Sequence, residues 1–148
     1  AKVYANKAYN ANPNHTFVLS AYGDSLIRNG EIDNGIKIFE TMYEKEPIPA
    51  MDSNSDRPLK KLFFAYYLNK NFDKCNEIFN QIEEHDFREW LVYVDIKVKQ
   101  NIDYLKENWF ESGMEKFKDR DWKKEISLFH LDNKEVKSNL EKLAQNLY

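Results

Sequence analysis

The side chains best suited to acid–base or nucleophilic chemistry are three histidines and one cysteine. They are His15, Cys75, His85 and His130, and they lie far apart in the sequence. A nucleophile needs a base within hydrogen-bond reach, and none of the four has such a partner at a fixed local spacing. No metalloprotease motif, nucleophile elbow, phosphate-binding glycine loop or paired-cysteine motif occurs either. The sequence therefore predicts no catalytic residue and no cofactor, although catalytic groups can also assemble across a fold.

One acidic segment begins like a calcium-binding loop. Asp52, Asn54 and Asp56 alternate as the first ligands of such a loop do. However, Arg57 stands where the loop needs glycine, and Phe63 stands where it needs the bidentate acid. We therefore predict a polar turn here and no metal site.

The only cysteine indicates packing rather than reactivity. A single cysteine excludes an intrachain disulfide. Cys75 lies in a stretch with apolar periodicity, which predicts a buried thiol. One thiol fits the cytosol and also a disulfide-free periplasmic protein, so the compartment stays open, with the cytoplasm slightly favoured over the periplasm.

The composition favours long helices in one ordinary domain. The chain has 148 residues, of which 42% are hydrophobic and 15% aromatic, with 4 Gly and 4 Pro. Its 22 Lys and Arg against 25 Asp and Glu give a net charge of -3, which provides no bulk attraction to nucleic acid or anionic lipid. No apolar run reaches the roughly 18 residues of a membrane span, so we expect a soluble protein without membrane insertion.

A lysine-rich segment with interleaved tryptophans has the composition of some RNA-binding surfaces. Acidic residues run through the same segment, and mixed signs at helical spacing are typical of a solvated helix face. We therefore predict no nucleic-acid partner. The cations are Lys97, Lys99, Lys106, Lys116, Lys118, Arg120, Lys123 and Lys124, and the acids are Asp95, Asp103, Glu107, Glu111, Glu115, Asp119 and Asp121.

Two helices joined by a tight turn are predicted between His15 and Pro47. Gly30 suits the left-handed C-cap of the first helix, and Pro47 ends the second. Apolar residues recur at helical spacing on both sides of Gly30. They are Phe17, Leu19, Tyr22 and Leu26 in the first helix, and Ile32, Ile36, Phe39, Met42 and Tyr43 in the second.

A second copy of this hairpin follows at a constant offset. The alignment places Leu59 on Leu19, Tyr66 on Leu26, Phe79 on Phe39 and Ile82 on Met42. One helical hairpin cannot bury its apolar face alone, so a repeated hairpin predicts a stack of such units.

The spacing of the first copy resembles a tetratricopeptide repeat, and the resemblance extends over about residues 1–87. It implies an all-α fold, a right-handed superhelical stack of antiparallel helix pairs with a C-terminal capping helix. The small residues Gly23 and Gly35 would let the two helices of a pair approach closely. The residues that match the signature are Leu19, Tyr22, Gly23, Leu26, Gly30, Gly35, Phe39 and Pro47.

We expect one helical domain over residues 1–148, opening inside a truncated repeat. Val92, Val94 and Ile96 also alternate as in a strand, so a strand near residues 90–100 is the alternative to the helix that the context favours. The expected segments are the second helix of the truncated repeat at 1–13, a repeat at 16–47, an insertion loop at 48–58, a degenerate repeat at 59–87, divergent helices at 88–131 and a capping helix at 133–148.

The resemblance implies a non-catalytic scaffold that binds a protein or peptide in the concave groove of the stack. Phe64 and Tyr67 are aromatic at positions where solvation alone would favour polar residues. A terminal-carboxylate receptor of the co-chaperone type is not expected, because Ser20 and Asp24 stand where that subclass has Lys and Asn. The residues predicted to line the groove are Phe17, Asp24, Ile27, Arg28, Lys60, Phe64 and Tyr67.

Two other functions remain open at this point. The chain could be a helical accessory or regulatory domain of an enzyme, with a pocket around His130 or Cys75. It could also be a structural module that self-associates into a homo-oligomer through its open N-terminal repeat.

Overall fold

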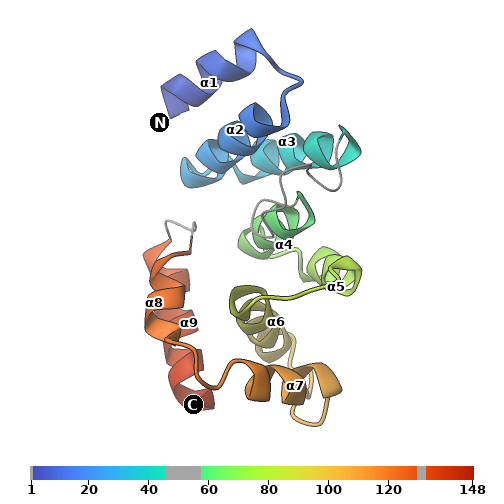
Figure 1. Ribbon diagram of the computed structural model, residues 1–148, viewed down its shortest axis with the longest axis vertical. Helices are drawn as coiled ribbons and strands as arrows, with labels where there is room; N and C mark the ends of the chain where they lie inside the picture. Colours follow the sequence, from blue (N-terminus) through green and yellow to red (C-terminus); the bar gives the residue numbers. More distant parts are fainter. Residues whose placement is uncertain (1, 46–57, 130–132) are drawn as a thin grey trace. The chain divides into compact units, whose positions relative to one another are not determined.

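The computed structural model describes residues 2–45, 58–129 and 133–148, and every regular element in these ranges is an α-helix. This confirms the predicted all-α class. The helices are α1 (Lys2–Ala11), α2 (Thr16–Arg28), α3 (Ile32–Lys45), α4 (Pro58–Leu68), α5 (Phe72–Gln81), α6 (Phe87–Lys99), α7 (Asn108–Lys116), α8 (Trp122–Ser127) and α9 (Lys134–Leu147) (Figure 1).

The helices group into two compact units, and the single domain expected over residues 1–148 stays a prediction. The first unit spans residues 1–82 and the second spans residues 83–148. In the first unit each helix packs on the next along the chain, α1 on α2, α2 on α3, α3 on α4 and α4 on α5. In the second unit α6 contacts α7, α8 and α9, and α8 also packs on α9.

The hairpin of α2 and α3 closes around two glycines. Gly23 faces the ring of Phe39 so closely that a Cβ at this position would overlap it. A Cβ at Gly35 would lie 2.6 Å from Ile27 Cδ1 and 3.2 Å from the carbonyl oxygen of Gly23. Gly30 follows the end of α2 with φ at 81°, a conformation that glycine adopts without steric cost. The glycines therefore let large apolar side chains fill the space between two closely packed helices.

The hairpin of α4 and α5 uses a different contact at the equivalent positions. Phe63 replaces the small residue, and its ring centroid lies 6.0 Å from that of Phe79. Cys75 stands where the first hairpin has Gly35, and its thiol donates to the Phe63 carbonyl oxygen at 3.4 Å. Both aromatic side chains are buried. The sequence departs from the repeat pattern here, but the hairpin is retained.

The ambiguous segment at residues 90–100 is a helix and not a strand. Every residue from Glu89 to Ile96 in α6 is buried. A helix that is covered on all sides carries apolar residues around its whole circumference, and this produces the run of valines that resembled a strand. The backbone N–H of Asp86 donates to Glu89 Oε1 at 3.2 Å, so α6 begins where the sequence predicted the end of a repeat.

Trp90 lies at the centre of the second unit. Its ring stacks on Phe110 with centroids 5.7 Å apart, and its Nε1 donates to the Trp109 carbonyl oxygen at 3.2 Å. Gly113 of α7 lies directly against the indole. From α9, Leu140 is fully buried, as expected for a helix that covers an apolar core.

Candidate partner-binding surface

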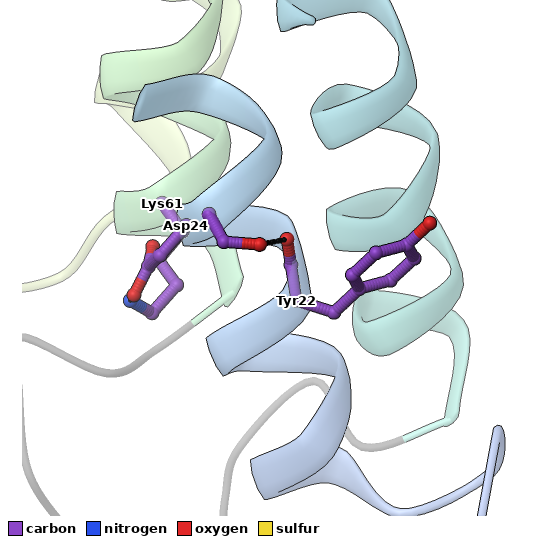
Figure 2. A network of polar contacts seen from close by, with 4 residues as sticks. Tyr22, Asp24 and Lys61 are labelled. Carbon is purple, nitrogen blue, oxygen red and sulfur yellow. Dashed lines mark hydrogen bonds and ion pairs between the residues drawn. The ribbon is translucent and has the colours of Figure 1, made fainter. Parts of the chain in front are cut away.

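One exposed stripe runs along α2. Phe17, Asp24 and Arg28 are separated by seven and four residues, so at 3.6 residues per turn they lie within about 40° of one another around the helix. Phe17 is 59% exposed and Arg28 is also exposed. Tyr22 points to the other side of α2, as Figure 2 shows. The stripe thus combines an exposed aromatic ring, a carboxylate and a guanidinium on one face.

An ion pair joins this stripe to α4. Lys61 Nζ lies 3.0 Å from Asp24 Oδ2 and 3.1 Å from Oδ1 (Figure 2). The Lys61 side chain is only 9% exposed, and its Nζ also lies 5.8 Å from the centre of the Phe39 ring. A carboxylate with both oxygens bound to one ammonium presents little net charge, so Lys61 largely neutralises Asp24.

Two further polar contacts hold α4 against α3. The Tyr66 hydroxyl donates to Glu40 Oε1 at 3.1 Å, and Asn69 Nδ2 donates to Asp33 Oδ1 at 3.1 Å. Burial of Tyr66, helped by the hydrogen bond to Glu40, raises the pKa of its phenol to about 12. These contacts fix the position of α4 relative to the α2–α3 hairpin.

Two of the residues predicted to line the groove, Lys60 and Tyr67, are buried instead, and a third, Ile27, is half-buried. Lys60 is 2% exposed and Tyr67 is 4% exposed. The Tyr67 ring packs on Phe72 of α5 with centroids 6.4 Å apart, and Ile27 packs against Gly35 of α3. Lys60 and Tyr67 are therefore buried and do not line an exposed groove, and Tyr67 faces α5.

The predicted groove omitted Lys61, the partner of Asp24. It shares one side of α4 with Phe64 and Leu68, at three and seven residues' distance, and both of these are half-buried. The spacing of these three residues in the sequence was the feature that could have placed Lys61 on this side of α4. We call the resulting face the α2–α4 surface; its members are Phe17, Asp24 and Arg28 of α2 and Lys61, Phe64 and Leu68 of α4.

The described residues considered for catalysis differ in their exposure to solvent. His15 is exposed and stacks on Phe17 with ring centroids 5.7 Å apart, and His85 is half-buried. Cys75 is fully buried, and this burial raises the pKa of its thiol to about 12. His130 and the acidic segment with Asp52, Asn54 and Asp56 fall outside the described residues.

Within residues 2–45, 58–129 and 133–148, no group of three or more His, Cys, Asp or Glu side chains is arranged to hold a metal ion. No helix in these ranges combines the length and apolar character needed to cross a membrane.

Comparisons with protein families, with curated proteins and with solved structures found no match to this chain.

Proposed function

We propose that this protein is a non-catalytic scaffold that binds a protein or peptide on the α2–α4 surface. In this proposal, residues 1–82 form a tetratricopeptide-like stack in which α2 and α4 are the first helices of consecutive pairs. The packing of each helix on the next supports it, since nearest-neighbour contacts are characteristic of repeat proteins.

The observation that carries the proposal is the exposed stripe of α2 and its ion pair with α4. Aromatic rings and arginine are over-represented among residues that dominate protein interfaces, and Phe17 and Arg28 are both exposed here. Lys61 joins the two helices through its ion pair with Asp24. The surface therefore offers apolar contact at one end and a cation at the other, about 16 Å apart along the helix.

Selection from a displayed random peptide library tests this proposal. Peptides enriched on the wild-type protein should bind the Phe17→Ala, Arg28→Ala double variant about tenfold more weakly, which corresponds to about 1.4 kcal/mol. Leu128→Ala is the matched control, because Leu128 is 60% exposed in the second unit. If the enriched peptides bind the wild type and the double variant equally, the α2–α4 surface is not their binding site.

A further inference from the structure

The turn between α2 and α3 carries an Asn–Gly sequence, a pair of residues that can modify itself chemically. The chain contains two such pairs, Asn29–Gly30 and Asn34–Gly35. Asparagine is one of the thermally labile residues, and glycine leaves the following backbone nitrogen without a Cβ beside it. The reaction needs no partner other than water, so the backbone around each pair decides whether it proceeds.

The reaction is the deamidation of asparagine through a cyclic imide. The glycine nitrogen loses its proton to a base in the solvent and attacks the asparagine Cγ. A nitrogen–carbon bond forms, the side-chain amide bond breaks, and ammonia leaves with a proton from the solvent. Water then opens the imide at either carbonyl and gives aspartate, or isoaspartate, in which the main chain runs through Cβ and Cγ. Ammonia is exchanged for water, and the product is a carboxylate at neutral pH.

The pair Asn34–Gly35 is protected because it lies inside α3. The Gly35 nitrogen donates to the Glu31 carbonyl oxygen at 3.0 Å, and Gly35 is buried against Ile27 of α2. The attack requires the Asn34 backbone to leave the helical conformation. This movement would open the first turns of α3 and the contact between α2 and α3.

The pair Asn29–Gly30 lies between the two helices and is exposed. Gly30 has φ at 81°, and a Cβ there would meet no atom within 4 Å, so the ring and the attacking water have space. Asn29 Nδ2 donates to the Ser25 carbonyl oxygen at 2.7 Å, and the Gly30 nitrogen donates to that of Ile27 at 3.0 Å. Both bonds break when the last turn of α2 frays, which costs less than opening the interior of a helix.

The second hairpin contains a twin of this turn that lacks the glycine. Asn69 and Lys70 occupy the places of Asn29 and Gly30, and Lys70 also has a positive φ, 59°. Both turns contain the same two backbone hydrogen bonds at the helix end, with N···O distances of 2.9–3.1 Å, and each asparagine amide donates to one acceptor. The Lys70 side chain is the main difference, because its Cβ hinders attack by the backbone nitrogen.

From these three sites we infer that Asn29 is a self-modification site, which deamidates in the folded protein much faster than Asn34 and Asn69. The reaction goes beyond the proposed function and does not depend on it. A carboxylate at position 29 cannot donate the bond that Asn29 Nδ2 makes to the Ser25 carbonyl oxygen. It also adds negative charge at the C-terminal end of α2, where the helix dipole is already negative. Deamidation therefore weakens the α2–α3 hairpin.

Mass spectrometry of the full chain can follow all three asparagines at once. The folded protein is kept in mildly alkaline buffer, and samples are digested at acid pH and fragmented by electron transfer, which separates aspartate from isoaspartate. Modification should accumulate at Asn29 at least about tenfold faster than at Asn34 and Asn69, because only fraying of a helix end is needed. In guanidinium chloride, where no helix protects the chain, Asn34 should react as fast as Asn29 while Asn69 stays slow.

Two substitutions separate the effects of the glycine and of the new charge. Lys70→Gly places glycine in the twin turn at a positive φ and should speed modification of Asn69 about tenfold. Asn29→Asp, which mimics the aspartate product, should lower the urea concentration at the midpoint of unfolding. Asn34→Asp is the control, because its carboxylate lies in the first turn of α3, where the dipole favours it and the midpoint should stay unchanged or rise.

Four results would overturn the inference. Comparable rates at Asn29 and Asn34 in the folded protein would show that α3 gives no protection. An Asn29 that stays intact in the folded protein but reacts in guanidinium chloride would show that the turn itself protects it. An unchanged rate at Asn69 in Lys70→Gly would show that glycine in this turn is not the determinant. An unchanged unfolding midpoint of Asn29→Asp would reject the weakening of the hairpin.

Discussion

Gly23 shows how one residue sets the distance between two helices. Its missing Cβ leaves room for the ring of Phe39, which is buried and cannot move into solvent. Gly35 is less restrictive, because the nearest atom to a Cβ there is the flexible Cδ1 end of Ile27 at 2.6 Å. The repeat signature predicted small residues at both positions, and the structure shows which partner each one accommodates.

We expect Gly23→Ala to lower the free energy of unfolding by about 1–2 kcal/mol, because overpacking against Phe39 outweighs the gain of about 1 kcal/mol from helix propensity. Urea denaturation measures this change. Ala21→Gly, at an exposed position of the same helix, gives the propensity contribution separately. A more stable Gly23→Ala protein would mean that the α2–α3 contact is looser than described.

Cys75 should be unreactive in the native protein. Its thiol is buried and its raised pKa of about 12 leaves almost no thiolate near neutral pH. A colorimetric thiol reagent should therefore modify it only after unfolding. Ser112→Cys adds a thiol at an exposed position and should react at once. Rapid modification of the native wild-type protein would contradict the burial of Cys75.

The raised pKa of the Cys75 thiol makes the free energy of unfolding depend on pH in the alkaline range. Below the ordinary thiol pKa of 9.0, Cys75 is protonated in both states and contributes its full stabilisation. As the pH rises from 9.0 towards about 12, the unfolded thiol ionises while the native thiol does not, so stability falls. Between about pH 8 and pH 11, urea denaturation should show a larger loss for the wild type than for Cys75→Ala. Equal losses would show that another group causes the dependence.

At the scale of elements, the Asp24–Lys61 pair connects α2 and α4 through two residues that are 37 positions apart in the sequence. A double-mutant cycle with Asp24→Ala and Lys61→Ala should give a coupling energy of about 1 kcal/mol, since Lys61 is largely shielded from solvent. The exposed pair Glu115–Lys118 is the control, for which coupling should stay below about 0.5 kcal/mol. Similar coupling for both pairs would indicate that Lys61 is more solvated than described.

The docking of α7 on α6 depends on Gly113. A Cβ at this position would overlap the Trp90 indole, whose Nε1 is held by the Trp109 carbonyl oxygen. Gly113→Ala should therefore destabilise the protein by about 2 kcal/mol and change the tryptophan fluorescence. Ser112→Ala, the exposed neighbour, should be neutral or slightly stabilising. An unchanged fluorescence spectrum of Gly113→Ala would mean that residue 113 does not contact Trp90.

Helix positions were easier to predict than helix orientations. The apolar spacing from Phe17 to Tyr43 located α2 and α3 because each has one buried side. In α4, apolar and aromatic residues occur on most sides of the helix, so the periodicity did not show which side faces inward. Tyr67 and Lys60 were consequently predicted on the surface, and only the tertiary structure shows that both are buried.

At the scale of the molecule, protection from solvent differs sharply between α6 and α1. The segment Glu89–Ile96 of α6 is continuously buried, whereas none of residues 3–11 is. In hydrogen exchange followed by mass spectrometry, peptides from α6 should exchange slowest and those from α1 fastest. Leu140→Ala, in α9 against α6, should speed exchange in α6. Equal protection of α1 and α6 would mean that α1 is covered in solution, as the docking of a second copy would do.

The sequence by itself determined the all-α class, most helix positions and the repeated hairpin, because these follow from local periodicity, capping and glycine placement. Tertiary structure decided the rest. The division after Ile82, the burial of Lys60 and Tyr67, and the pairing of Lys61 with Asp24 depend on contacts between helices distant in the sequence. Such contacts are set by which sides of several helices meet at once, and the periodicity of any single helix does not contain that information.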